Sequence, residues 1–358
     1  MVKKSDEMND ILNAVDALNK KYGKGSIFVG QQKIRIPTYR TGILALDHAT
    51  HTGGFPRGRL IEIYGKESSG KTYITFKNIA ECQSRGETCV FLDVEQAFDP
   101  IWASKCGVDV SKLIFGQPST AEEVFDTIEM FARTGKVSLI VIDSVAAMTT
   151  QKEEESESID IGFPQKAKLL SNGMRRVVPI LAQTKTNAIF INHLMEDIGK
   201  MGFGPKTTTP GGKALKYYSS LRIECAKIKT LKDGDFACGC RTKVKIIKNK
   251  LATPYGEGEY DFIFGSGVSN EVSYIEFAEQ FGVIKKEGRK YVYGKDSFST
   301  SVPDIIEYLK TENGMKLMSE VNEKIYNHNG EIEDENETEH EQISSGDLES
   351  VGTQNYSE

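Results

Sequence analysis

One short segment constrains the fold of this chain more than any other. Residues 65–72 match the pattern G-x-x-x-x-G-K-[ST]. The match follows the apolar, β-branched run Leu60–Tyr64 and opens a helical pattern over Thr72–Arg85. Because a phosphate-binding loop needs a strand before it and a helix after it, the segment predicts an α/β fold.

The residue types of this segment suit a bound triphosphate. Gly65 and Gly70 let the backbone fold around phosphate oxygens, and the N–H groups of the loop supply positive potential. Lys71 brings a charge to the β- and γ-phosphates, and Thr72 offers a hydroxyl to Mg²⁺. We therefore expect ATP and Mg²⁺ as cofactors. The nucleotide loop is assigned Gly65, Lys66, Glu67, Ser68, Ser69, Gly70, Lys71 and Thr72.

Two acids follow other predicted strands. Asp143 ends an apolar run that begins at Leu139, so it should stand beside the phosphates and hold the water shell of Mg²⁺. Glu95 lies two residues past the run ending at Asp93, where its carboxylate could accept a proton from water. A salt-bridged surface glutamate explains the position of Glu95 equally well.

Strand-like and helical runs alternate through a predicted core domain, residues 41–269. The alternation indicates a mostly parallel twisted sheet flanked by helices. The predicted strands are Leu60–Tyr64, Cys89–Asp93, Leu139–Asp143, Ala188–Asn192, Leu221–Cys225 and Lys243–Lys248. The predicted helices between them are Thr72–Arg85, Ala121–Arg133 and Gln165–Gln183. Segments 151–164 and 194–212 lack either period and are predicted loops.

Three further parts complete the predicted organisation. Residues 1–40 contain an amphipathic helix over 5–22 and a linker, residues 270–326 form a small α+β domain, and residues 327–358 are a disordered acidic tail. Residues 331–358 contain ten acids and neither Lys nor Arg, which leaves the rest of the chain mildly basic. A basic body with an acidic tail can meet a polyanion.

Composition excludes other classes of protein. No apolar run approaches the roughly 20 residues that span a bilayer, and the first residues lack the apolar stretch of a secretion signal. The cysteines show no second pair that would complete a zinc spacing. We expect a cytoplasmic protein with reduced thiols and no membrane partner.

Several sequence blocks together resemble the bacterial RecA recombinases, over about residues 23–274. Besides the phosphate loop, the blocks are Phe91–Glu95, Asp99–Pro100, Val141–Ala147, Thr207–Leu215 and Val244–Lys250. The block Pro210–Tyr218 separates this family from other phosphate-loop ATPases. The resemblance implies a RecA-like P-loop ATPase core with an N-terminal helix that packs on a neighbouring subunit.

The resemblance also implies a function. Members polymerise as helical filaments on single-stranded DNA, pair it with homologous double-stranded DNA, exchange strands in repair, and hydrolyse ATP in a DNA-dependent manner. Bacterial members also stimulate self-cleavage of a LexA-like repressor in the SOS response, and the sequence leaves open whether this chain does so. The rival interpretations are a ring helicase or a regulatory ATPase on the same fold, and a non-catalytic DNA-coating protein with a degenerate site.

Family motifs carry residue roles onto this sequence. They imply that Glu95 is the hydrolytic base and Asp143 the acid on the Mg²⁺ side. Asp99 would face the adenine amine, and Trp102 would stack on adenine where the family usually has Tyr. The lysines Lys248 and Lys250 would reach the γ-phosphate from the adjoining subunit, and Asn192 and His193 would lie at the nucleotide.

The two predicted loops would hold DNA along the filament axis. Phe163 and Ile198 stand where apolar residues wedge between bases, although ordinary local packing explains them as well. An apolar wedge with basic groups around it can separate bases without reading them. The residues that the family motifs place on DNA are Phe163, Lys168, Arg175, Ile198, Lys206, Gly211 and Gly212. The basic residues between 285 and 295 would gather duplex DNA.

The sequence departs from the family at several points. His193 occupies the place of a Gln that senses the γ-phosphate, which predicts a pH-dependent link between DNA and ATP turnover. Residues Leu194–Asp197 are apolar and acidic where the family tends to be basic, which weakens the case for phosphate contacts there. Lys66 replaces a Pro and Tyr73 replaces a Thr, and neither change touches Gly70, Lys71 or Thr72.

Overall fold

The computed structural model of the chain describes residues 2–23, 27, 36–155, 163–196, 207–265, 267–268 and 270–326. It divides into two compact units, residues 1–37 and 38–358. In the first unit, helix α1 (Val2–Tyr22) covers the predicted amphipathic helix. The side chain of Asn19 forms two hydrogen bonds with the backbone of Ile27. Its Nδ2 donates to the Ile27 carbonyl at 2.7 Å, and its Oδ1 accepts from the Ile27 amide at 2.9 Å.

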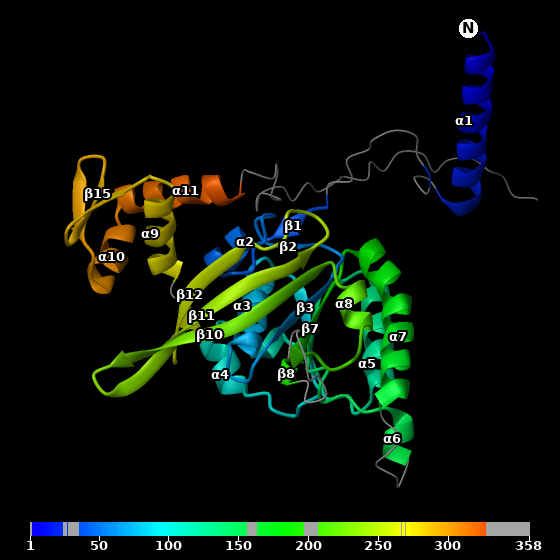
Figure 1. Ribbon diagram of the computed structural model, residues 1–358, viewed down its shortest axis with the longest axis horizontal. Coiled ribbons are helices and arrows are strands. Elements are labelled where there is room, and N and C mark those ends of the chain that lie inside the picture. The colour runs from blue at the N-terminus through cyan, green and yellow to red at the C-terminus, as the bar shows by residue number, and fades with distance from the viewer. Residues whose placement is uncertain are drawn as a thin grey trace, which may run out of the picture. The chain divides into compact units, whose positions relative to one another are not determined.

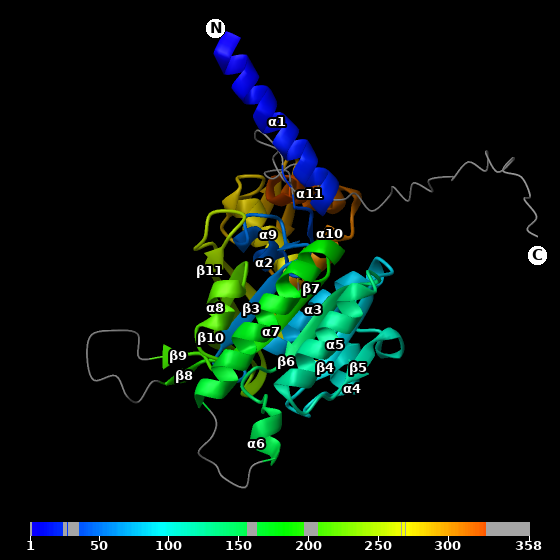
Figure 2. The ribbon, with the colours of Figure 1, turned by 90° about the vertical axis from the view of Figure 1, so that its right-hand side faces the viewer.

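The second unit is built on a sheet of nine strands (Figures 1 and 2). The strand order is β13-β12-β11-β10-β3-β7-β6-β4-β5, with parallel pairing from β10 through β5 and antiparallel pairing from β10 to β13. The strands are β3 (Leu60–Gly65), β4 (Thr88–Asp93), β5 (Ile114–Gly116), β6 (Val137–Asp143), β7 (Asn187–His193), β10 (Leu221–Asp233), β11 (Phe236–Asn249), β12 (Glu257–Ile263) and β13 (Gly267–Val268).

Helices cover both faces of this sheet. Helices α5 (Ala121–Arg133), α7 (Phe163–Thr184) and α8 (Ala214–Tyr218) pack on one face, and α2 (Leu44–Ala49), α3 (Lys71–Ser84) and α4 (Pro100–Lys105) on the other. Figure 2 looks onto α5 and α7 with the sheet behind them. The predicted fold class, a mostly parallel sheet flanked by helices with a small C-terminal α+β part, is confirmed.

Alternating side chains of the parallel strands fill two apolar cores. In β6, Val141 joins the core under α3, while Ile140 and Ile142 join the core under α5 and α7. In β7, Ile189 and Phe190 divide in the same way. A strand buried on both faces reads as a continuous apolar run, which is why these strands were predictable from the sequence.

The C-terminal part, which follows residue 269, contains three helices and one small sheet among the described residues. The sheet has the order β14-β15-β16 and is antiparallel. The elements of the C-terminal part are α9 (Asn270–Gln280), β14 (Lys285–Glu287), β15 (Lys290–Tyr293), β16 (Asp296–Ser299), α10 (Val302–Leu309) and α11 (Glu312–Tyr326). The tail after residue 326 lies outside the described residues, and the predicted domain boundaries stay predictions.

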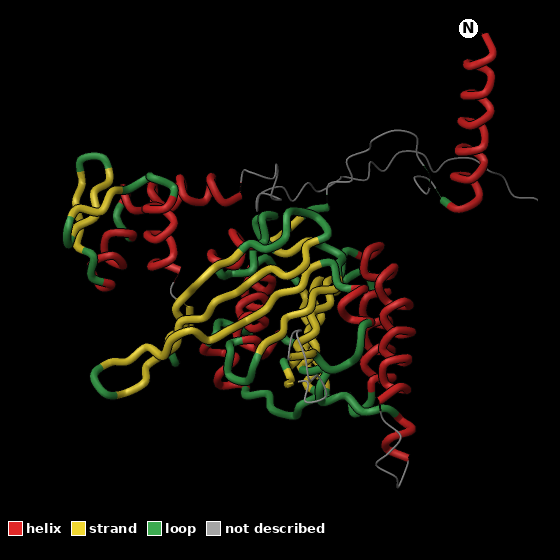
Figure 3. Tube along the Cα trace, viewed as in Figure 1, coloured by secondary structure: helices red, strands yellow, loops and turns green. Residues whose placement is uncertain are grey.

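The remaining elements are short. They are β1 (Thr38–Tyr39), β2 (Phe55–Pro56), the 3-10 turn η1 (Val110–Lys112), α6 (Gln151–Glu155), β8 (Met195–Glu196) and β9 (Thr207–Thr208). Strands β1 and β2 pair with each other, as do β8 and β9. Figure 3 shows the long β10–β11 hairpin extending past the neighbouring strands.

Both predicted loops are shorter than the sequence indicated. The first begins as helix α6 because Thr150 and Glu153 form a capping box: the Glu153 amide donates to Thr150 Oγ1 at 3.2 Å, and the Thr150 amide donates to Glu153 Oε2 at 2.7 Å. The second contains β8 near its start and β9 further along, and these two short strands pair with each other. Residues 156–162 and 197–206 lie outside the described part of the chain.

Candidate functional site

The carboxyl ends of four parallel strands meet at one edge of the sheet. Strand β3 ends at Gly65, opposite His193 at the end of β7, and Asp93 of β4 lies opposite Asp143 of β6. Backbone hydrogen bonds tie the segments that follow, because the Glu95 amide donates to the Asp143 carbonyl at 3.0 Å. Ligands of parallel α/β sheets bind beyond such strand ends.

The phosphate loop crosses this edge between β3 and α3. Gly70 precedes α3 with a φ of +91°, a left-handed conformation that favours glycine. Lys71 is 6% exposed, and its Nζ donates to the carbonyls of Gly65 (3.2 Å) and Lys66 (2.8 Å). Burial lowers the pKa of Lys71, with the nearby carboxylates of Asp143 and Glu95 opposing the shift.

Two features of the loop fit a bound triphosphate. The hydroxyl of Ser69 is buried and has no hydrogen-bond partner among the described residues, so a ligand oxygen could satisfy it. A Cβ on Gly65 would lie 2.2 Å from the Cys225 carbonyl oxygen, so only glycine lets the loop start so close to β10. The residues present therefore fit a nucleotide phosphate.

Thr72 and Asp143 form the candidate Mg²⁺ side of the site. The Thr72 hydroxyl donates to Asp143 Oδ2 at 2.8 Å. Burial raises the pKa of the Asp143 carboxyl to about 6, and the hydrogen bond from Thr72 only partly opposes that rise. A hydroxyl and a carboxylate are oxygen ligands of the kind that Mg²⁺ prefers.

Glu95 is held by two donors on one oxygen. Its Oε1 accepts a hydrogen bond from the hydroxyl of Ser144 and lies 2.8 Å from Nε2 of His193. Burial opposes the charge on Glu95, but the hydrogen bonds from Ser144 and His193 outweigh burial and lower the pKa of its carboxyl. An ionised carboxylate beside the phosphate loop can accept a proton from water.

Asp93 stabilises the turn that carries Glu95. This buried carboxylate accepts hydrogen bonds from the amides of Ala97 (3.1 Å) and Phe98 (3.0 Å) and from Nε2 of Gln117 (3.2 Å). The two amide donors fix the course of the chain from Val94 to Phe98, so Asp93 positions Glu95.

Asn192 braces the site from inside the protein. It is fully buried, its Nδ2 donates to Glu62 Oε1 and to the Pro210 carbonyl, both at 3.1 Å, and its Oδ1 accepts from the His193 amide at 3.0 Å. These bonds engage both polar atoms of its amide and connect His193 to the block that begins at Pro210. Contact of Asn192 with the nucleotide stays a prediction.

The two residues predicted at the adenine lie together at the start of α4. Asp99 Oδ1 caps this helix by accepting from the amides of Ile101 (2.8 Å) and Trp102 (3.1 Å). The Trp102 ring packs edge-on against Phe76, with a centroid distance of 5.1 Å. Adenine contact by either residue stays a prediction.

Lys248 and Lys250 lie at the end of β11, which the sheet order places beside β10. Lys248 Nζ donates to the carbonyls of Lys216 (2.6 Å) and Tyr217 (3.0 Å) in α8. Burial, with the charges of Lys250 and Arg222, lowers the pKa of Lys248 to about 8. Both lysines are predicted to act on a nucleotide of another subunit, and this single chain does not test that role.

The predicted DNA residues that the structure describes with their surroundings divide into two groups. Lys168 and Arg175 are exposed on α7, seven residues apart and so on one side of the helix. Gly211 and Gly212 have φ values of +87° and +72°, and a Cβ on them would meet Leu170 and Ala167 of α7, so they allow close packing there. Ile198, Lys206 and the side chain of Phe163 lie outside the described residues.

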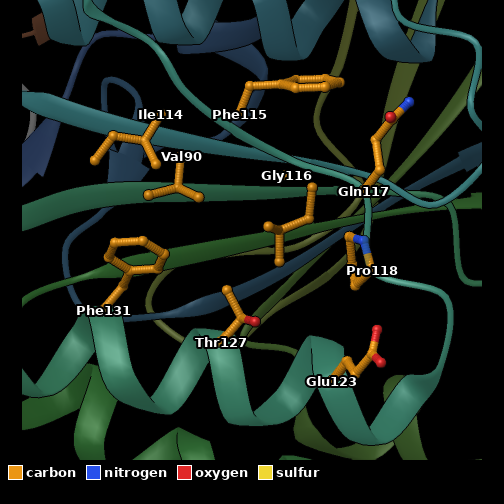
Figure 4. A pocket seen from close by; sticks show the side chains of 10 residues that line it. Val90, Ile114, Phe115, Gly116, Gln117, Pro118, Glu123, Thr127 and Phe131 are labelled. Atoms are coloured by element: carbon orange, nitrogen blue, oxygen red, sulfur yellow. The ribbon is translucent and has the colours of Figure 1, made fainter.

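A separate pocket of about 330 Å³ opens between the edge strand β5 and helix α5 (Figure 4). Apolar side chains line most of it, among them Val90, Ile114 and Phe131. None of its lining residues belongs to the predicted nucleotide site. Gln117 is the link between the two, because it lines the pocket and also donates to Asp93.

Comparisons with known proteins decide the family. The family described as RecA N-terminal domain matches residues 9–269. "Protein RecA" of Halalkalibacterium halodurans is 40% identical over 341 residues, covering 94% of this chain and 97% of that protein. "Protein RecA" of Frankia casuarinae is 42% identical over 315 residues, covering 87% and 90%. The chain belongs to the RecA family.

RecA homologues of this similarity support a role as a RecA recombinase. "Protein RecA" of Tropheryma whipplei, 44% identical over 297 residues, covers 80% of this chain and 68% of its own length. Among the described residues, no helix is both long enough and apolar enough to span a bilayer.

The sequence analysis did not identify three residues that support the candidate site. Ser144 donates to Glu95, and Glu62 pairs with Arg222 beneath Asn192. Ser144 follows a predicted metal-side acid directly, so its position was a usable signal. No such signal marks Glu62, because a single acidic residue within an apolar strand predicts neither its burial nor its partner.

Proposed function

We propose that the protein is an ATP-dependent recombinase. It forms helical filaments on single-stranded DNA, pairs that strand with homologous double-stranded DNA, and exchanges strands in recombinational repair. The observation that carries the proposal is the meeting of Lys71, Thr72, Glu95 and Asp143 at adjoining strand ends. The family match supports the DNA half of the proposal.

The residues would divide the work of hydrolysis. The loop 65–72 would wrap the phosphates, with Lys71 leaving its carbonyl partners for phosphate oxygens and Ser69 gaining a partner. Thr72 and Asp143 would hold Mg²⁺. Mg²⁺·ATP, when bound, supplies the phosphoanhydride that water cleaves. Glu95, ionised and oriented by Ser144 and His193, would take the proton of that water.

A DNA-dependent ATPase assay with electron microscopy tests the proposal. Purified protein with single-stranded DNA and a non-hydrolysable ATP analogue should form long helical filaments, and ATP turnover should rise when DNA is added. Closed rings would favour the rival helicase or regulatory ATPase. Absence of both filaments and ATP turnover would overturn the proposal.

Lys71→Ala provides the matched control for the nucleotide site. Removing the ammonium leaves the triphosphate without its main mobile cation, so nucleotide affinity should fall below detection. Retained affinity in this variant would contradict the assignment of loop 65–72.

Wild-type filaments mixed with a LexA-like repressor test the role in the SOS response. Cleavage of the repressor supports that role, and an intact repressor contradicts it.

A further inference from the structure

Tyr73 joins the first turn of helix α3 to strand β13. It follows Thr72 directly, is only 2% exposed, and its hydroxyl oxygen accepts a hydrogen bond from the Val268 amide at 2.6 Å. The Tyr73 ring also packs on Phe262 of β12, with a centroid distance of 4.4 Å. A side chain from the helix that opens at the phosphate loop therefore ends on the backbone of β13.

The backbone of β13 is shaped for this contact. This strand ends the strand order of the described sheet, where it pairs with β12. Gly267 has a φ of +86°, and a Cβ on it would lie 2.9 Å from the Tyr73 hydroxyl oxygen. Glycine suits this left-handed conformation and leaves room for the hydroxyl. The amide of Val268 thereby gains a side-chain acceptor at the edge of the sheet.

Strand β13 lies at the junction between the sheet and the C-terminal part. Helix α9 begins at Asn270, two residues after Val268. Asn270 is itself anchored, because its Oδ1 accepts from the Leu44 amide at 3.2 Å and its Nδ2 donates to the Gly42 carbonyl at 3.0 Å. Two separate segments thus hold the junction, and one of them is the first turn of α3, through Tyr73.

We propose that Tyr73 is a positioning residue that links the phosphate loop to this junction. A phosphate bound by the loop amides would stabilise the first turn of α3, because the N–H groups and the helix dipole favour an anion there. That turn carries the Tyr73 hydroxyl, so bound nucleotide strengthens the hydrogen bond from Val268 and steadies the start of the C-terminal part. The link depends on tyrosine, since the hydroxyl of a threonine lies on Cβ and could not reach β13.

Amide hydrogen exchange of the nucleotide-free protein tests the hydrogen bond. Tyr73→Phe keeps the ring on Phe262 and removes only the hydroxyl, so the Val268 amide should exchange about tenfold faster than in the wild type. Tyr274→Phe is the matched control, because it removes a hydroxyl that donates to Asn322 Oδ1 at 2.9 Å, away from β13. Exchange of Val268 in this control should stay within about twofold of the wild-type rate.

Two results would overturn the hydrogen bond as the anchor of β13. One is equal exchange of the Val268 amide in the wild type and Tyr73→Phe. The other is equally fast exchange in Tyr73→Phe and Tyr274→Phe, which would mean that the loss of any tyrosine hydroxyl in this region loosens the junction.

A fluorescent, non-hydrolysable ATP analogue with Mg²⁺ tests the link to the phosphate loop. In the wild type the analogue should slow exchange of the Val268 amide by about threefold, and in Tyr73→Phe it should leave this exchange unchanged. Thermodynamic linkage then requires the wild type to bind the analogue more tightly than Tyr73→Phe, by the same factor. A purely structural role of the hydroxyl would leave the affinity for the analogue unchanged.

The nucleotide half of this inference rests on the proposed function, and the hydrogen bond itself does not. If the wild type does not bind the analogue at all, the proposed nucleotide site fails and the nucleotide half of the inference fails with it. If the wild type binds the analogue but exchange of Val268 does not change, or if wild type and Tyr73→Phe bind it equally, the link is refuted while the proposed function stands. The two failures are therefore distinguishable.

Discussion

Glu95 and His193 are joined across strand β6. Glu95 follows β4 and His193 ends β7, yet Nε2 of His193 lies 2.8 Å from Oε1 of Glu95. The same oxygen accepts the hydroxyl of Ser144, which follows the intervening strand. Three neighbouring strand ends thus converge on one carboxylate oxygen.

This arrangement predicts that His193 sets the orientation of Glu95. His193→Ala removes one of two donors to Oε1, so the Glu95 pKa should rise toward its usual value and kcat should fall by about tenfold. His193→Gln keeps a donor without a charge and should retain most of the kcat. Steady-state ATPase assays of both variants, with and without DNA, give the result. An unchanged kcat in His193→Ala would contradict the role.

The buried Asp143 predicts how Mg²⁺ binding depends on pH. Because burial raises the pKa of Asp143 to about 6, the metal must displace a proton below that pH. Affinity for Mg²⁺·nucleotide should therefore fall by up to about tenfold for each pH unit below 6. Titration of a fluorescent ATP analogue measures the effect. The Asp143→Asn variant, and the wild type with EDTA, should both bind the nucleotide weakly and without this pH dependence. If either showed the same pH dependence as the wild type with Mg²⁺, the assignment of Asp143 to the Mg²⁺ site would be refuted.

The nucleotide half of the site was largely predictable from the sequence, for a physical reason. Strands buried on both faces are continuous apolar runs, and parallel strands end at one edge of the sheet. The positions of Gly65, Asp143 and Glu95 at that edge therefore follow from the amino-acid sequence alone. Their roles in catalysis stay predictions.

Contacts to backbone atoms were not predictable in the same way. The acceptors of Lys248 are carbonyls of Lys216 and Tyr217, which every residue type carries, so no sequence signal marks them. The hydrogen bond from Asn192 to the Pro210 carbonyl was not predictable either, because it depends on packing between segments that are distant in the sequence. The capping box of Thr150 and Glu153 was a readable signal that went unused.

The end of α11 predicts a pH dependence of stability. Tyr326 donates to Asp47 Oδ2 at 2.9 Å, and the Thr41 amide donates to Asp47 Oδ1 at 2.9 Å. Burial nevertheless raises the pKa of Asp47 to about 7. The folded state then binds this proton more tightly than the unfolded state, so Asp47 contributes stability below about pH 4, which is lost as the pH rises to about 7.

Asp47→Asn should remove this contribution, because Asn stays neutral and can keep both hydrogen bonds. Relative to the wild type, the free energy of unfolding of the variant should rise by roughly 2 to 4 kcal/mol between pH 4 and pH 8. Urea unfolding at several pH values measures the difference. A difference that does not vary with pH would show that Asp47 has an ordinary pKa in the folded protein.

The start of the phosphate loop predicts the effect of a single methyl group. In Gly65→Ala, the new Cβ would lie 2.2 Å from the Cys225 carbonyl oxygen of β10, so β3 and β10 must separate or the loop must move. We expect a loss of about 2 to 3 kcal/mol in the free energy of unfolding. We also expect at least about tenfold weaker nucleotide binding, because the loop amides lose their alignment. Gly116→Ala is the matched control, since its Cβ would meet only the flexible end of Leu92 at 3.3 Å. Chemical unfolding and nucleotide titration of both variants measure these effects. Equal effects in the two variants would mean that any added methyl group destabilises the sheet. The close approach of Gly65 to Cys225 would then have no special part in shaping the loop.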